Sequence, residues 1–253
     1  MKKIAIITGA SSGMGKEFAR VAATRLRSLD ELWLIARRTD RLEDLRRTYG
    51  TKIRPIGLDL SDSEKLSALS AMLENETPDV RLLINSAGLG IIGRVDEIET
   101  SEIMNMVKVN VDALTCLCSM VLPYMRRGAH IINMASAAAF LPQPVFAVYA
   151  ASKSYVLSFS RALNKELDKK GIHVTAVCPG PVKTEFFEIA ERYRSVADYK
   201  KFFMASPEKV VNKAFIDAAK NKPVSVYSIS MKLSFFFTKI LPHSLLIKLM
   251  RLV

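Results

Sequence analysis

Residues 3–15 read KIAIITGASSGMG, an apolar run that leads into a turn containing Gly9, Gly13 and Gly15. The apolar run is too short for the core of a signal sequence, so it predicts a first strand over 3–8. Glycines tolerate positive φ and let a ligand approach the backbone, and the helix that follows offers free N–H donors at its start. The stretch therefore predicts a strand, an anion-binding turn and a helix in direct succession.

Strand-like apolar runs alternate with longer helical patterns along the rest of the chain. Continuous apolar strands between helices are typical of a parallel sheet covered on both faces. No linker rich in Pro, Gly or Ser divides the chain, so we predict a single α/β domain over 1–253, doubly wound, with about seven strands. The strands are expected at 3–8, 31–36, 52–58, 80–85, 129–135, 172–178 and 224–228. The helices are expected near 14–28, 40–48, 62–75, 100–126, 147–170 and 207–220.

The composition allows a large core but gives the chain a basic surplus. Of its 253 residues 49% are hydrophobic and 25% charged, and the net charge is +12. Half of that surplus lies in residues 218–253, which contain six Lys or Arg and no acid. A basic balance favours anionic ligands or surfaces. No zinc-finger or helix-turn-helix spacing occurs, so no nucleic-acid partner is expected.

Cys116, Cys118 and Cys178 lie in apolar segments and lack the spacing of metal ligands. We expect structural thiols in a reducing compartment, hence a cytoplasmic location, and no metal site. A membrane-spanning helix is not expected, because no uninterrupted run reaches about 18 apolar residues.

The second expected strand ends in Leu34-Ile35-Ala36-Arg37-Arg38. A dinucleotide site that prefers the form without the 2′-phosphate usually carries an acid at this point. Guanidinium groups instead form bidentate, charge-assisted bonds with phosphate. The stretch predicts NADP(H), although Arg37, Arg38 and Arg41 could simply begin a solvated helix.

Polar residues also follow the third and fourth strands, as Leu58-Asp59-Leu60 and Asn85-Ser86-Ala87-Gly88. Ligands of open α/β sheets bind at the carboxyl ends of the strands. Asp59 could alternatively cap the next helix, as could Ser61. Asn110 lies in a helical pattern although Asn is a mediocre helix former, and it could bond to neighbouring backbone.

Tyr149 and Lys153 are one turn apart in the helix expected over 147–170, and Ser136 precedes that helix. A phenol normally keeps its proton to about pH 10. We expect the ammonium group to lower the tyrosine pKa, so that the pair can exchange a proton with an alkoxide or alcohol. Ser136 could hydrogen-bond the same oxygen. Taken alone, the pair would far more often be two solvated side chains on an exposed helix.

Together, in this order and spacing, these residues resemble the short-chain dehydrogenase/reductase family from residue 3 to about 228. The resemblance implies a Rossmann-like fold and hydride transfer between NADP(H) and a ketone or secondary alcohol. It implies that Tyr149 donates the proton, Lys153 binds the nicotinamide ribose, Ser136 orients the substrate oxygen and Asn110 holds a relay water. Met14 and Ser86 replace a common Ile and Asn. The expected cofactor-binding residues are Thr8, Gly9, Ser11, Ser12, Gly13, Met14, Gly15, Arg37, Arg38, Asp59, Leu60, Asn85, Ala87, Gly88, Tyr149, Lys153, Pro179, Gly180, Val182 and Thr184.

The substrate is the least determined part of this interpretation. Arg37, Arg38 and the loop at 179–186 look like the subgroup of acyl ketone reductases and hydroxysteroid dehydrogenases, which implies an apolar substrate and lipid metabolism. A homodimer or homotetramer is expected. The alternative is a non-catalytic dinucleotide-binding or membrane-associated scaffold, whose signature would be a broken Ser/Tyr/Lys set; here the set is complete.

Two segments extend beyond the motifs. Residues 184–206 mix aromatic and charged side chains, which predicts either a substrate lid or a helix packed on the core. Residues 229–253 form a basic amphipathic extension that Pro242 should split into two short helices. Its apolar side could cover the lid, a second subunit or an anionic membrane surface.

Overall fold

The computed structural model describes residues 1–195 and 204–249. Within these residues the strands form one parallel sheet in the order β3-β2-β1-β4-β5-β6-β7. The chain runs outward from β1 to β3 and then crosses back to β4, so the doubly wound, Rossmann-like fold is confirmed. The strands are β1 (Lys3–Thr8), β2 (Glu31–Ala36), β3 (Ile53–Gly57), β4 (Asp79–Asn85), β5 (His130–Met134), β6 (His173–Val177) and β7 (Val224–Ser225).

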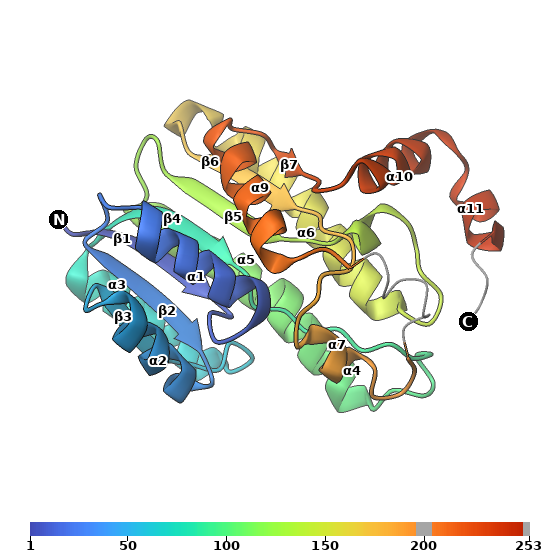
Figure 1. Ribbon diagram of the computed structural model, residues 1–253, viewed down its shortest axis with the longest axis horizontal. Helices are drawn as coiled ribbons and strands as arrows, with labels where there is room; N and C mark the ends of the chain where they lie inside the picture. Colours follow the sequence, from blue (N-terminus) through green and yellow to red (C-terminus); the bar gives the residue numbers. More distant parts are fainter. Residues whose placement is uncertain (196–203, 250–253) are drawn as a thin grey trace.

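Alternate residues of the strands enter two separate cores, one on each face of the sheet (Figure 1). Ile4 and Ile6 of β1 pack toward α3, α5 and α6, whereas Ala5 and Ile7 pack toward α1, α2 and α9. The helices are α1 (Gly13–Arg25), α2 (Thr39–Tyr49), α3 (Ser63–Glu76), α4 (Thr100–Val107), α5 (Leu114–Val121), α6 (Ala147–Glu166), α7 (Phe186–Ala190), α9 (Pro207–Ala219), α10 (Ile229–Ile240) and α11 (His243–Leu249).

The helical pattern expected over 100–126 is present but is not one regular helix. A π-helical turn (Lys108–Ala113) separates α4 from α5, and a 3-10 turn (Leu122–Tyr124) follows α5. In the described part of the chain, residues 100–124 are long and apolar enough to cross a membrane, which we did not expect from the sequence. In this fold, however, the inner face of α5 is buried in the core.

The cysteines differ from one another in burial. Cys118 and Cys178 are buried, and desolvation raises the pKa of each thiol to about 12, as suits structural residues. Cys116 is exposed on the solvent side of the amphipathic helix α5, so burial supports the expected structural role for Cys118 and Cys178 only.

Pro242 separates α10 from α11, as predicted. One side of α10 packs on the 3-10 turn Ala137–Phe140, where the rings of Phe140 and Phe235 lie 4.5 Å apart between centroids. His243 and Ile247 of α11 line a groove with residues of the 139–154 segment. The described part of the extension therefore packs on this segment. Tyr199, Phe202 and Phe203 of the expected lid lie outside the described residues.

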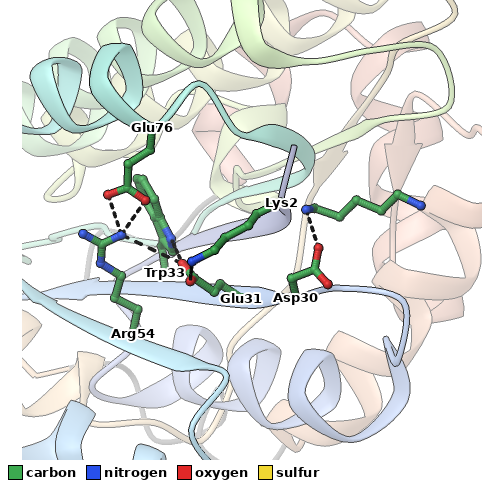
Figure 2. Close-up of polar contacts among 7 residues, drawn as sticks. Lys2, Asp30, Glu31, Trp33, Arg54 and Glu76 are labelled. Atoms are coloured by element: carbon green, nitrogen blue, oxygen red, sulfur yellow. Dashed lines mark hydrogen bonds and ion pairs between the residues drawn. The ribbon is translucent and has the colours of Figure 1, made fainter.

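A polar network lies at the amino ends of the strands (Figure 2). Arg54 lies 4.7 Å from the ring centroid of Trp33 and pairs with Glu76 at 2.7 Å. Glu31 accepts a hydrogen bond from the Trp33 indole at 2.9 Å and pairs with Lys2. These contacts join the amino ends of β1, β2 and β3 to α3. They do not involve the carboxyl ends of the strands, where ligands of open α/β sheets bind.

Candidate active site

The glycine turn after β1 is shaped by close backbone approaches. Gly9 has φ +65°, and a Cβ there would lie 2.8 Å from the backbone of Ala87. A Cβ on Gly15 would lie 2.2 Å from the carbonyl oxygen of Gly9. Only glycine fits either position, because the turn presses the start of α1 against β1 and β1 against the loop after β4.

The amino end of α1 fits a pyrophosphate. Ser12 occupies the N-cap without a side-chain capping bond, so the first N–H groups keep their donors for a ligand. Gly13, with φ +51°, faces Thr184 across the turn, and a Cβ there would come 3.3 Å from the Thr184 Cβ. The predicted pyrophosphate residues therefore meet the first residue of the expected lid.

Thr8 and Asn85 support the loop after β4 from below. The buried Thr8 hydroxyl accepts hydrogen bonds from the backbone of Ser86 and Ala87, both at 3.1 Å. The Asn85 amide donates to Asn133 at 2.9 Å. Thr8 thus positions the backbone of the loop, Asn85 is held by a neighbouring side chain, and their cofactor-binding role stays a prediction.

Gly88 leaves room beside the buried amine of Lys153. A Cβ at this position would lie 3.3 Å from Lys153 Nζ and 3.4 Å from Asn110 Oδ1. With no side chain at Gly88, the Lys153 ammonium and the Asn110 amide stay open to a ligand, and such polar groups suit the ribose hydroxyls of a dinucleotide. The chain's own residues therefore fit the cofactor at both its pyrophosphate and its nicotinamide end.

Ser136, Tyr149 and Lys153 come together, as the sequence predicts. Tyr149 is buried on α6, with its ring 4.3 Å from that of Phe146 and 5.5 Å from that of Phe186. Lys153 Nζ lies 5.7 Å from the centroid of the tyrosine ring and donates to the carbonyl of Met134 at 2.8 Å. Ser136 begins the 3-10 turn after β5 and hydrogen-bonds the phenol.

The expected lowering of the tyrosine pKa was wrong for this set of side chains. Burial raises the pKa of Tyr149 to about 12, and the hydrogen bond with Ser136 offsets only part of that rise. Burial also lowers the pKa of Lys153 to about 8. Desolvation penalises the charged form of both groups, and here it outweighs the attraction between phenolate and ammonium.

Asn110 forms the backbone contacts that its place in the sequence suggested. Its amide receives a hydrogen bond from Leu89 N at 2.8 Å and donates to Leu89 O at 2.7 Å and to the Ser152 hydroxyl at 3.0 Å. The π-helical turn places the amide at that point. The role in a water relay stays a prediction.

The arginines after β2 are paired with acids. Arg38 and Arg41 both bond the carboxylate of Glu185, at 3.0 Å and 2.7 Å, and Arg38 also donates to Ser11 at 3.4 Å. The more exposed Arg37 lies 4.0 Å from Asp59. Arg38 is the N-cap of α2 and both arginines are partly exposed, so the alternative of a solvated helix start stays open alongside their pairing with Glu185.

Asp59 turns toward its own loop. It accepts bonds from the backbone and hydroxyl of Ser61. Burial would raise the pKa of Asp59, but these bonds and the charge of Arg37 hold it below its ordinary value. The cap of α3 is Asp62, so neither Asp59 nor Ser61 has the capping role considered for them.

The remaining predicted residues shape the site through packing. Met14, Leu60 and Val182 pack in the two cores, Pro179 accepts a bond from Ala137 N at 2.8 Å, and Gly180 lies against Met231 of α10.

Sequence reasoning missed three features. Glu185 carries no local signal, because its partners lie 144 and 147 residues away. Ser152 and the Asn133–Ser160 bond of 2.9 Å were missed as well. A polar Asn133 inside the apolar run of β5 was the one signal that could have found the last of these.

Comparisons with known proteins agree with this geometry. The family described as short chain dehydrogenase matches residues 3–193. The NADP-dependent 3-hydroxy acid dehydrogenase of Schizosaccharomyces pombe is 31% identical over 222 residues, which cover 82% of this chain and 83% of that protein.

Two solved structures cover nearly the whole chain. A short-chain dehydrogenase from Sphingobium yanoikuyae in complex with NADPH has a TM-score of 0.80 at 26% identity, covering 99% of this chain and 97% of that one. A short chain dehydrogenase/reductase from Burkholderia phymatum in complex with NAD has a TM-score of 0.79 at 25% identity, covering 93% and 92%. This chain therefore belongs to the short chain dehydrogenase family and is an oxidoreductase acting on a hydroxyl or carbonyl group.

Proposed function

We propose that this oxidoreductase uses NADPH to reduce an apolar ketone, such as an acyl ketone or a steroid-like molecule, to a secondary alcohol. The observation that carries the proposal is the convergence of Ser136, Tyr149 and Lys153 beside a glycine turn that fits a dinucleotide. The bound cofactor supplies the hydride.

Each catalytic side chain has a distinct task in this proposal. Tyr149 keeps its proton at neutral pH, because burial raises its pKa to about 12, and it can donate that proton to an oxygen that gains charge during reduction. Ser136 holds the same oxygen by a second hydrogen bond. The hydrogen bond to the Met134 carbonyl fixes Lys153, so that its ammonium group lies close to the tyrosine ring and to Gly88.

The arginines at the end of β2 support NADP(H) over NAD(H). Arg37 and Arg38 occupy the point where a carboxylate would bind the ribose hydroxyls of NAD. A relative named as NADP-dependent and a solved relative holding NADPH agree with this choice, although another solved relative holds NAD.

An apolar substrate is supported by the surroundings of Tyr149. Phe146 and Phe186 contact its ring, and Phe187 packs edge-on against Phe186 at 5.4 Å. Ile91 and Ile92 are buried in the same small clusters. Aromatic and aliphatic walls favour a hydrocarbon body beside the carbonyl.

Replacing Tyr149 by Phe tests the proposal. We expect loss of turnover by about a factor of a hundred or more, because no other proton donor replaces the phenol, while NADPH binding stays close to that of the wild type. The assay follows NADPH absorbance with ketosteroids, acyl ketones and small diketones, and binding is followed by NADPH fluorescence. Tyr155→Phe, an exposed tyrosine on the same helix, is the matched control.

Two outcomes would count against the enzyme. Full activity in Tyr149→Phe would remove the assigned acid. Tight NADPH binding by the wild type, with turnover of none of the ketones and no oxidation of the matching alcohols, would favour the non-catalytic scaffold.

The setting of the enzyme is part of the same proposal. We infer a cytoplasmic protein that assembles as a homodimer or homotetramer through α4, which exposes Met104 and Val107. We also infer peripheral contact with an anionic membrane through α10, whose charged residues are lysines.

A further inference from the structure

Glu185 joins the expected lid to the arginines that follow β2. It follows Thr184 directly and forms the N-cap of α7, the first helix of the lid. One carboxylate oxygen lies 2.7 Å from Arg41 Nη1, and the other lies 3.0 Å from both Arg38 Nη1 and Arg41 Nη1. A single carboxylate thus bridges two guanidinium groups from the turn between β2 and α2.

These guanidinium groups stand where the proposed function needs phosphate ligands. Arg38 follows β2, at the point that distinguishes dinucleotides with and without the 2′-phosphate. A carboxylate and a phosphate offer guanidinium the same bidentate, charge-assisted bonding. The donors that Glu185 occupies are therefore the donors that a 2′-phosphate would use.

We propose that Glu185 is a specificity-determining residue that competes with the 2′-phosphate of NADP(H) for Arg38 and Arg41. The inference rests on the proposed NADP(H) site and deepens it. Binding of the phosphate exchanges one anion for another on the same two arginines and releases the carboxylate. NAD(H), which has no 2′-phosphate, leaves the pairing intact.

The carboxylate is equipped for this competition at neutral pH. Hydrogen bonds from Arg41 and Arg38 hold the pKa of Glu185 below its ordinary value, so the side chain is ionised. Arg38 and Arg41 remain half-exposed, which lets a phosphate from solvent reach them. A dianion can displace a monoanion from such a site because it interacts more strongly with the same pair of cations.

The pairing also lies between the pyrophosphate turn and the surroundings of Tyr149. Thr184, on one side of Glu185, faces Gly13 in the pyrophosphate turn, and Phe186, on the other side, packs against the ring of Tyr149. Release of Glu185 frees the start of α7 between these two contacts. Occupation of the 2′-phosphate position is thereby coupled to the wall of the substrate site.

The test compares Glu185→Gln with the wild type and with Glu188→Gln. Gln keeps the size of the side chain but loses the charge, and Glu188 is an exposed acid on the same short helix. The probes are 2′,5′-ADP and 5′-AMP, with their dissociation constants measured by calorimetry on the full-length protein. Since exposed ion pairs are weak, we expect Glu185→Gln to bind 2′,5′-ADP about two- to tenfold tighter. Binding of 5′-AMP should be unchanged, and Glu188→Gln should match the wild type with both probes.

Arg38→Gln separates failure of this inference from failure of the cofactor assignment. If Arg38→Gln weakens 2′,5′-ADP binding while Glu185→Gln leaves it unchanged or weaker, the competition is overturned and the NADP(H) site stands. If the wild type binds 2′,5′-ADP no tighter than 5′-AMP and Arg38→Gln changes neither, the phosphate site and the competition are both overturned.

Discussion

Lys153 shows how a single residue can cost stability in exchange for a chemical role. Its amine is buried and donates to the carbonyl of Met134, beside Tyr149. Burial lowers its pKa from 10.5 to about 8, so at neutral pH the lysine stays charged, and its ammonium group is less stable in the folded protein than in the unfolded chain. Between these two pKa values the unfolded chain binds more protons, and the stability of the wild type therefore rises with pH.

Lys153→Met should accordingly stabilise the protein while it removes activity. The pKa shift corresponds to about 3 kcal/mol at pH 7, because each unit is worth about 1.4 kcal/mol. Loss of the hydrogen bond to the Met134 carbonyl reduces this stabilisation by about 1 kcal/mol. Urea unfolding at pH 7 and pH 9.5 should show a higher midpoint for the variant at pH 7 and a smaller difference at pH 9.5.

The control is Lys165→Met, an exposed lysine on the same helix. It should show no comparable gain and no convergence with the wild type as the pH rises. Equal or lower stability of Lys153→Met at both pH values would mean that the buried ammonium group is well compensated in the folded protein.

Site residues with a local signature could be predicted, and those defined by distant partners could not. Glycine turns and the Tyr149–Lys153 spacing are set by backbone conformation over a few residues, so the sequence displays them directly. Glu185 and its arginines meet only after the whole sheet has formed. The tyrosine pKa depended on burial, which the spacing of two side chains does not report.

At the scale of elements, most strands were predictable because they are short, mainly apolar runs, although β3 contains Arg54 and Pro55 and β5 contains Asn133. The π-helical turn between α4 and α5 was not, because it depends on a contact across the fold. Its residue Asn110 forms three hydrogen bonds, two of them with the backbone of Leu89. A widened turn with a buried amide at its centre holds the loop after β4 at Leu89.

Asn110→Leu should therefore loosen this loop as well as destabilise the fold. Leucine is similar in size but leaves the Leu89 backbone unpaired, at a cost of about 2–3 kcal/mol. In the variant, hydrogen exchange should accelerate more at the Leu89 amide than at the Leu83 amide of β4. The Leu83 amide serves as the reference because its exchange reports global stability. An unchanged difference between these two amides would show that the π-helical turn does not hold the loop.

The molecule as a whole is doubly wound up to β7, and α10 then leaves the sheet (Figure 1). This helix carries apolar residues on two opposite sides. Met231 and Phe235 pack inward against the core. At 100° per residue, five exposed residues form a stripe on the opposite side. They are Ile229, Leu233, Phe236, Phe237 and Ile240, with exposed fractions from 49% to 76%.

The charge of this region favours an anionic membrane over a second copy of the chain. Lys232 and Lys239 lie along one flank of the stripe, and residues 218–253 contain no acid. Two copies placed face to face would bring like charges together, whereas anionic lipids would neutralise them. An amphipathic helix with lysines beside its apolar face is typical of an interfacial helix.

Leu233→Gln with Phe236→Gln tests this contact without removing the inward face of α10. The wild type should float with vesicles that contain anionic lipid and much less with neutral vesicles, because both the apolar stripe and the lysines contribute. The Leu233→Gln, Phe236→Gln variant should lose most of the binding to both kinds of vesicle. The Lys232→Gln, Lys239→Gln variant should lose binding only to the anionic vesicles. Ile216→Gln, an equally exposed apolar position on α9, should bind like the wild type. If the wild type stays unbound and the double variant changes only its oligomeric state in light scattering, the stripe is a subunit interface.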